Sequence, residues 1–294
     1  MSELVEIKEI SLSLKHTFSE INNFMVKINN IEIGDNKPFV LIAGPCVVEN
    51  ENVIFHTMEE IKKITEELNI PFIFKSSYKK ANRTSGKTFT GIGDDEALTI
   101  LDKAKNKFQV PVLTDIHTTE EARKSSKVAD VLQIPAFLCR QTELLIAAGK
   151  TGKAINIKKG QFLAPEDMKH AAEKIVSTDN KNILLTERGT TFGYHNLVVD
   201  MRSFVIMREL GFPVVMDATH SVQIPSRGNE SGGQPKFIKP LARAAAAVGI
   251  DALFLEVHPN PKVAKSDAES QLPLNELKDL LLDIKEIDRV IKKY

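Results

Sequence analysis

Short apolar, β-branched runs alternate with longer amphipathic stretches from Pro38 onward, and the alternation recurs eight times. Short apolar runs of this kind are typical of buried strands, and parallel neighbours in a sheet need a crossover, usually a helix, between them. The pattern therefore predicts strands joined by helices. The predicted strands are Phe39–Ala43, Pro71–Ser76, Pro111–Asp115, Asp130–Ile134, Ala154–Ile157, Asn182–Thr186, Pro213–Asp217 and Asp251–Glu256.

The stretches between these runs have helical spacing. Apolar residues recur on one face of Asn52–Leu68, an Ala-rich helix is predicted over Pro240–Val248, and the last helix runs from about Asn275 to Lys292. Eight strand–helix units predict an α/β chain folded as a single (β/α)8 TIM barrel. The rival is an open doubly wound sheet, but no G-x-G-x-x-G follows the first strand to favour it.

The residues before Pro38 do not fit this repeat. Met25–Gly34 alternates polar and apolar residues around Asn29-Asn30, which predicts a β-hairpin that plugs the N-terminal mouth of the barrel. The expected organisation is residues 1–24 as a segment of unknown role, 25–37 as the hairpin and 38–294 as the catalytic barrel. No internal repeat or linker marks a second domain.

Composition excludes several classes of partner. Lys and Arg together number 39, as do Asp and Glu, so there is no global field to hold nucleic acid or an anionic membrane. No apolar run approaches the length of a membrane span, and the N-terminus lacks the features of a signal peptide. We therefore expect a cytoplasmic protein. With only Cys46 and Cys139, a disulfide framework is not expected.

Polar residues follow every predicted strand, where the C-terminal strand ends of a barrel form its active face. Five cations converge there and predict a strongly anionic ligand, such as two phosphates or a phosphate and a carboxylate. These cations are Lys75, Lys80, Arg83, Lys158 and Arg188. Lys75 ends a buried apolar run, where an unpaired ammonium is costly, so we expect the substrate to be its partner.

Alternation in the fifth strand decides between two adjacent lysines. Asn156 and Lys158 lie on the face opposite Ile155 and Ile157. Lys158 is therefore predicted to face the interior, and Lys159 to be its neighbour at the rim.

A second group of residues has the chemistry of metal ligands. Cys46, His220, Glu256 and Asp267 follow the first, seventh and eighth strands, which adjoin in a closed barrel. A thiolate, an imidazole and two carboxylates can bind one divalent metal. Spacing alone leaves the alternative open, because a lone Cys after Gly-Pro is more often a small buried residue.

Taken together, the motifs resemble the barrel synthases that use phosphoenolpyruvate to make 3-deoxy-keto acids, and specifically the 3-deoxy-D-manno-octulosonate-8-phosphate synthases. The resemblance covers roughly residues 25–275. It is carried by Ala43-Gly44-Pro45-Cys46, Phe74-Lys75-Ser76-Ser77, Lys80-Ala81-Asn82-Arg83, Gln133-Ile134-Pro135-Ala136-Phe137-Leu138, Asn156-Ile157-Lys158-Lys159-Gly160-Gln161-Phe162, Thr186-Glu187-Arg188-Gly189 and Asp217-Ala218-Thr219-His220.

The resemblance implies a transferase that joins phosphoenolpyruvate, D-arabinose 5-phosphate and water into 3-deoxy-D-manno-octulosonate 8-phosphate, a lipopolysaccharide sugar precursor, and phosphate. The sibling 3-deoxy-7-phosphoheptulonate synthases use erythrose 4-phosphate and typically carry Lys-Pro-Arg-Thr where this chain has Lys80-Ala81-Asn82-Arg83. That difference favours the eight-carbon product. A non-catalytic phosphosugar-binding barrel is the alternative from another class.

The same resemblance assigns roles to individual residues. Phosphoenolpyruvate would be held by Lys75, Lys80, Gln133, Lys158 and Arg188. The arabinose 5-phosphate chain and its phosphate would be bound by Asn82 and Arg83, with Arg140 reaching the aldose phosphate of a neighbouring subunit in a homotetramer. Candidate catalytic residues are Lys80, Asp115, His117 and His220, with the acid and the base unassigned.

The resemblance also bears on the metal. The family contains metal-dependent members with Cys at the position of Cys46 and metal-independent members with Asn there. Because Cys46 stands here, the expected cofactor is one divalent transition metal, namely Zn, Fe(II), Mn or Co, with the ligands Cys46, His220, Glu256 and Asp267.

Overall fold

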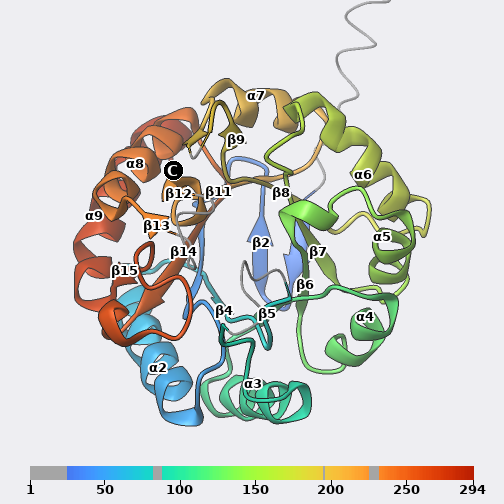
Figure 1. Ribbon diagram of the computed structural model, residues 1–294. Coiled ribbons are helices and arrows are strands. Elements are labelled where there is room, and N and C mark those ends of the chain that lie inside the picture. Colours follow the sequence, from blue (N-terminus) through green and yellow to red (C-terminus); the bar gives the residue numbers. More distant parts are fainter. Residues whose placement is uncertain (1–24, 82–87, 195, 225–231) are drawn as a thin grey trace, which may run out of the picture.

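The computed structural model describes residues 25–81, 88–194, 196–224 and 232–294. Its centre is a closed parallel barrel, seen along its axis in Figure 1, so the predicted TIM barrel is confirmed. Around the barrel the strands follow one another in chain order, and β14 pairs with both β11 and β3 to close it. The barrel strands are β3 (Val40–Gly44), β4 (Phe72–Lys75), β5 (Val112–Asp115), β6 (Val131–Ile134), β7 (Ala154–Lys158), β8 (Ile183–Glu187), β11 (Val214–Asp217) and β14 (Ala252–His258).

A ring of helices surrounds the strands (Figure 1). They are α2 (Glu51–Leu68), α3 (Asp94–Phe108), α4 (Thr119–Ser125), α5 (Thr142–Gly149), α6 (Met168–Val176), α7 (Arg202–Glu209), α8 (Ile238–Val248) and α9 (Leu277–Lys292). Helix α2 begins where the Asn50 side chain accepts the N–H of Val53. It ends at Asn69, which adopts the left-handed conformation. None of the helices in the described parts of the chain is long and apolar enough to cross a membrane.

The predicted hairpin is present and closes the N-terminal end of the barrel. Its strands are β1 (Val26–Ile28) and β2 (Ile31–Ile33), joined by a turn in which Asn29 has a φ of 53°. Asn tolerates this left-handed conformation better than most residues. The apolar hairpin side chains pack in one cluster with inward-facing residues near the strand starts, such as Val40 and Ala252.

Further along each barrel strand, the inward positions change from apolar to polar. Ile73 on β4 and Leu113 on β5 belong to the interior apolar cluster, and the positions two residues later are Lys75 and Asp115. Because strand side chains alternate between faces, these polar residues lie above the apolar layer on the same inner face. Polar residues at equivalent positions are Gln133, Asn156, Lys158, Thr186, Asp217 and Glu256.

Short additional strands lie at the C-terminal end of the barrel. They are β9 (Thr190–Thr191) with β10 (Leu197–Val198), β12 (Gln223–Ile224) with β13 (Gly232–Gly233), and β15 (Leu272–Pro273), which pairs in parallel with the end of β14. The loop between β14 and β15 carries Asp267 and lies beside the segment that follows β3.

Candidate active site

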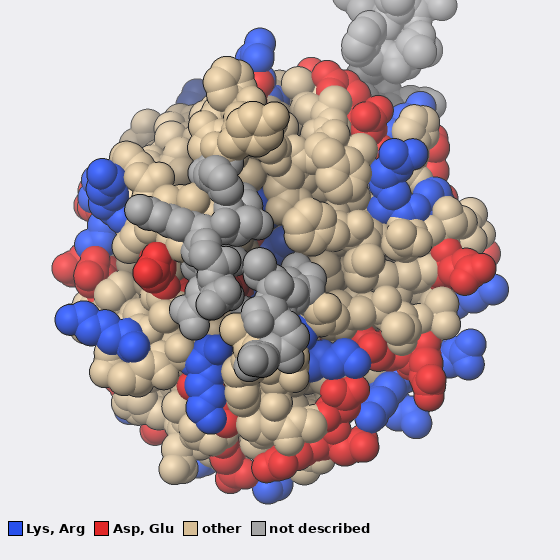
Figure 2. Space-filling model, viewed as in Figure 1, with Lys and Arg blue, Asp and Glu red and all other residues tan. Residues whose placement is uncertain are grey.

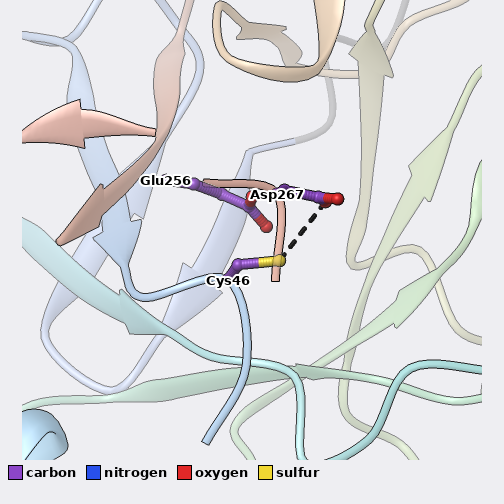
Figure 3. Close-up of side chains that lie close together, drawn as sticks. All are labelled: Cys46, Glu256 and Asp267. Carbon is purple, nitrogen blue, oxygen red and sulfur yellow. Dashed lines mark hydrogen bonds between the residues drawn. The ribbon is translucent and has the colours of Figure 1, made fainter. Parts of the chain in front are cut away.

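The four residues with metal-ligand chemistry gather at one place in the mouth of the barrel. Cys46 follows β3, Glu256 projects inward from β14, and Asp267 lies in the β14–β15 loop, as Figure 3 shows. One ligand atom from each of these three lies within 4.8 Å of the others. His220, just after β11, adds its Nε2 at 3.5 Å from Glu256 Oε1 and 3.9 Å from Asp267 Oδ2.

The electrostatics of this group suit a bound cation. Burial, together with the carboxylates of Asp267 and Glu256, raises the pKa of the Cys46 thiol, so a thiolate here needs a positive partner. Glu256 Oε2 is buried and accepts no hydrogen bond from any of the described residues. Such an orphaned oxygen beside a thiol and a second carboxylate fits a divalent ion.

Asp217 orients the imidazole of His220. Asp217 Oδ2 lies 2.8 Å from His220 Nδ1, and Oδ1 accepts the backbone N–H groups of Thr219 and His220 at 3.2 and 2.9 Å. Burial opposes ionisation of Asp217, but His220 and Lys158 outweigh it and hold the pKa of this carboxyl well below its usual range. The arrangement turns Nε2 toward Glu256 and Asp267, as carboxylate–histidine pairs do at metal sites.

The buried lysines of the mouth are paired with carboxylates of the chain. Lys75 donates to Glu256 Oε1 and, at 3.1 Å, to the carbonyl of Cys46. β14 thus supplies a buried carboxylate that the sequence did not reveal as a neighbour of Lys75, and the expectation that the substrate is a partner of this ammonium stays a prediction. Lys80 Nζ lies 3.6 Å from the same Glu256 oxygen.

Lys158 faces the barrel interior, as strand alternation predicts. Its ammonium pairs with Asp217 and lies 3.6 Å from the centroid of the Phe254 ring. Burial lowers the pKa of Lys158 although Asp217 opposes the shift. Lys159 is fully buried rather than at the rim, and Lys159 Nζ lies 2.9 Å from Thr190 Oγ1 and 3.5 Å from Glu187 Oε1.

One nitrogen of the Arg188 guanidinium donates no hydrogen bond to any of the described residues. Its Nη2 donates to Gln223 Oε1 at 3.0 Å, whereas its buried Nη1 has no hydrogen-bond partner within the described parts of the chain. Burial lowers the pKa of this guanidinium. A buried guanidinium N–H without a partner is a place where an anionic ligand group can bind.

A chain of hydrogen bonds crosses the inner face from β8 to β5. Thr186 donates to Asn156, Asn156 donates to Gln133 at 2.8 Å, and Gln133 donates to Asp115. Ser77 donates to the other oxygen of Asp115 at 2.6 Å. Burial opposes ionisation of Asp115, but Lys80 and Lys75 lower its pKa.

Sequence reasoning named Gln133 and Asp115 but not the partners that fix them. Thr186 and Ser77 lie within motifs that carry the resemblance, but neither was given a role, although Thr186 is an inward polar position in the strand alternation. His117 follows β5 and lies apart from the metal-type group, with its Nδ1 2.8 Å from Glu121 Oε2. Sequence reasoning missed Glu121 as well, although Thr118 and Glu121 have the spacing of a helix cap.

The structure does not test the three residues expected at the aldose phosphate. Asn82 and Arg83 lie outside the described residues. Arg140 is exposed on the turn before α5, and its backbone carbonyl accepts a bond from Lys174 at 3.0 Å.

Comparison with known proteins gives consistent matches over almost the whole chain. Residues 16–293 match the DAHP synthetase I family. The chain is 53% identical over 268 residues to the 2-dehydro-3-deoxyphosphooctonate aldolase of Geotalea uraniireducens, covering 91% of this chain and 98% of the relative. The enzyme of the same name from Fusobacterium nucleatum is also 53% identical over 268 residues, or 91% of this chain and 96% of the relative.

Proposed function

The chain belongs to the DAHP synthetase I family, and we propose that within it the protein is a 3-deoxy-D-manno-octulosonate-8-phosphate synthase. It condenses phosphoenolpyruvate with D-arabinose 5-phosphate and water and releases phosphate. The observation that carries this function is the single mouth that holds both the buried cations and the Cys46 group. Its relatives with 52–53% identity are named for the same eight-carbon product.

The reaction forms a bond between C3 of phosphoenolpyruvate and the aldehyde carbon, adds water at C2, and breaks the C–O bond to phosphate. Positive charge develops at C2 while negative charge leaves on phosphate. Lys75, Lys80, Lys158 and Arg188 bind the carboxylate and phosphate of phosphoenolpyruvate and stabilise the leaving anion. Gln133, fixed between Asn156 and Asp115, orients the same substrate.

The candidate groups for proton transfer are Asp115, His117 and His220. Asp115 is held ionised by Lys80 and Lys75, so it accepts hydrogen bonds and balances their charge. The imidazoles of His117 and His220 are each oriented by a carboxylate, Glu121 and Asp217, and are the candidate proton carriers.

One divalent transition metal, Zn, Fe(II), Mn or Co, is proposed as cofactor. Cys46, His220, Glu256 and Asp267 would hold it, because their donor atoms converge and one buried carboxylate oxygen lacks a partner within the described parts of the chain. When bound, the ion supplies Lewis acidity toward an oxygen ligand. The four proposed ligand residues themselves position the aldehyde and exclude bulk water.

We propose that the protein is a cytoplasmic homotetramer. Arg140 is exposed at the rim beside Phe137, whose side chain is 56% exposed, and Phe162, Phe192 and Tyr194 are also exposed. Figure 2 shows surface without charged side chains between the centre of this face and helices α6 and α7. Exposed aromatic residues of this kind are enriched in protein interfaces. A phosphorylated aldose does not cross membranes, which favours the compartment where it is made.

The experiment that tests the function measures phosphate release from phosphoenolpyruvate with and without an aldose phosphate. Release should require arabinose 5-phosphate and should be much slower with erythrose 4-phosphate. Preference for erythrose 4-phosphate would indicate the seven-carbon synthase. Binding of arabinose 5-phosphate without any phosphate release would indicate a non-catalytic barrel.

A further inference from the structure

The loop that carries Asp267 is tied to the segment that follows β3. Cys46 Sγ and Ser266 Oγ lie 2.8 Å apart, and Gln271 Oε1 accepts the N–H of Cys46 at 3.3 Å. Gln271 Nε2 donates to the Ser266 carbonyl at 2.8 Å. These contacts hold the loop beside Cys46. The two that Gln271 makes are to backbone groups, the N–H of Cys46 and the carbonyl of Ser266.

Glu49 adds a charged side chain to this connection. Its side chain is buried, at 6% exposure, and its Oε1 accepts the backbone N–H of Lys265 at 2.8 Å. The same oxygen lies 3.7 Å from Nε2 of His258, a residue only 2% exposed whose Nδ1 accepts the N–H of Asn260 at 3.0 Å. Glu49 therefore joins the β3 segment, the end of β14 and the Asp267 loop.

The carboxylate of Glu49 is ionised near neutral pH. Burial opposes ionisation, but His258 and the Lys265 N–H outweigh it and lower the pKa of Glu49. A charged acceptor makes a stronger bond to a backbone N–H than a neutral one. The bond to the Lys265 N–H is therefore a charge-assisted hydrogen bond, unlike the bonds that Gln271 makes to Cys46 and Ser266.

The loop needs such ties because Asp267 is in an unfavourable backbone conformation. Its φ is 48°, which is left-handed for a residue with a side chain, and this costs of order 1 kcal/mol. Such a residue keeps its conformation only where surrounding contacts impose it. Ser270 donates its hydroxyl and its N–H to the Asp267 carbonyl, and the Glu49 bond fixes the chain two residues before Asp267, at Lys265.

We propose that Glu49 is a positioning residue of the metal centre, which holds the Asp267 carboxylate within reach of Cys46 and Glu256 without touching the ion itself. The inference rests on the proposed function, since it takes Asp267 as a metal ligand. Groups that hydrogen-bond directly to metal ligands usually contribute about 10–100-fold to metal affinity, and Glu49, which acts through the backbone of Lys265, should contribute toward the lower end of that range.

The test compares Co(II) binding by the full-length unaltered protein, Glu49→Ala and Glu49→Gln. Affinity is measured by chelator competition, and the near-ultraviolet thiolate-to-Co(II) absorption band reports the geometry at Cys46. Glu49→Ala should bind Co(II) about 10-fold more weakly with a weaker or shifted band. Glu49→Gln retains an oxygen that can accept the Lys265 N–H, so it should stay within about threefold of the unaltered protein.

Asp251→Ala is the matched control. Asp251 is also a buried carboxylate that accepts a backbone N–H at 2.8 Å, from Val214, but it lies at the start of β14, at the opposite end of the barrel. This variant should lose thermal stability and keep Co(II) affinity.

The outcomes separate this inference from the metal centre itself. If the unaltered protein bound Co(II) and Glu49→Ala bound it equally well with the same band, Glu49 would have no positioning role. If Asp251→Ala lost affinity to the same degree, general destabilisation would be the cause and the inference would fail. If the unaltered protein bound no Co(II), the proposed metal centre would fail first and the role of Glu49 with it. If Glu49→Ala does not fold, Glu49→Asp takes its place, because its carboxylate is one methylene shorter and is drawn away from the Lys265 N–H. Unchanged Co(II) affinity and an unchanged band in that variant would overturn the inference.

Discussion

Lys158 and Lys159 are adjacent in the sequence but lie in different environments. Lys158 faces the barrel interior over Phe254 and pairs with Asp217. Lys159 points away from that face and is fully buried, and its ammonium contacts Thr190 and the Glu187 carboxylate. Strand alternation separates the two, so one lysine serves the site and the other serves the packing of β7 against β8.

Replacing each lysine by Ala should therefore give opposite phenotypes. Lys158→Ala should keep more of its stability, because His220 and two backbone N–H groups still contact the Asp217 carboxylate, and should lose phosphoenolpyruvate turnover, because a charged group is missing from the site. Lys159→Ala should leave the buried Glu187 without its cation, which costs about 3–5 kcal/mol of unfolding free energy. Urea denaturation and steady-state kinetics of both variants check this. A stable Lys159→Ala variant with a raised Michaelis constant for phosphoenolpyruvate would reverse the assignment.

The least predictable feature of the site was which side chains contact one another. Lys75 was foreseen as a buried cation, but its partner Glu256 is 181 positions away in the chain. Strand alternation indicates which face a residue occupies, whereas the depth and direction of a long side chain depend on neighbouring strands. The same limit explains why Lys159 was expected at the rim and is buried.

At the scale of elements, helix α4 begins with a cap that also fixes His117. Thr118 accepts the N–H of Glu121 at 3.2 Å, and Glu121 Oε2 accepts the backbone N–H of His117 at 2.8 Å. Glu121 Oε1 pairs with Lys79 at 2.7 Å. Burial opposes ionisation of Glu121, but His117 and Lys79 outweigh it and lower its pKa.

This cap predicts a pH-dependent contribution to stability. Because the folded-state pKa of Glu121 lies below the unfolded value of about 4.3, its contribution is complete above that value and is lost as the pH falls below it. Glu121→Gln should destabilise the protein by about 1.5–3 kcal/mol at pH 7, and this deficit should shrink between pH 5 and about pH 3. Thermal melts of both proteins across this range test it. A deficit independent of pH would contradict the role of the charge.

Helix α9 is anchored by a buried carboxylate. Asp288 Oδ2 accepts the N–H of Phe39 at 3.0 Å and the Tyr294 hydroxyl at 2.9 Å, while Lys292 lies 2.9 Å from Oδ1. Asp288 is fully buried, so Asp288→Ala should cost about 3 kcal/mol or more and leave turnover per folded molecule unchanged. Asp283→Ala, on the exposed face of the same helix and paired with Arg243, is the control and should cost under about 1 kcal/mol. Equal losses in chemical denaturation would contradict the anchor.

The elements themselves were largely predictable. All eight strands form to within a residue or two of the expected bounds, because buried parallel strands leave short apolar runs and Gly, Pro or Asn marks many of their ends. The cap of α4 and the anchor of α9 were not foreseen. Both depend on which carboxylate reaches a particular N–H, and periodicity carries no information on that contact.

At the scale of the whole molecule, the metal-type residues lie where the barrel closes on itself. Cys46 follows the first barrel strand, and Glu256 and Asp267 belong to or follow the last one. These two strands, β3 and β14, pair in parallel along five positions. A bound ion would therefore link the first and last strands of the barrel where they pair. It would resist the separation of β3 from β14 along this seam.

Removal of the metal should accordingly destabilise the pairing of β3 with β14 more than the rest of the barrel. An ion bound only by the folded state adds about 4 kcal/mol at a thousandfold excess over its dissociation constant, so exhaustive chelation should abolish turnover and lower the melting temperature. Amide hydrogen exchange should rise in β3 and β14 more than in β6 and β7. Cys46→Ala should melt at the same temperature with and without chelator, because it lacks the thiolate ligand. If chelation lowered the melting temperature of Cys46→Ala as much as that of the unaltered protein, the ion would be bound elsewhere and the seam would owe its stability to strand pairing alone.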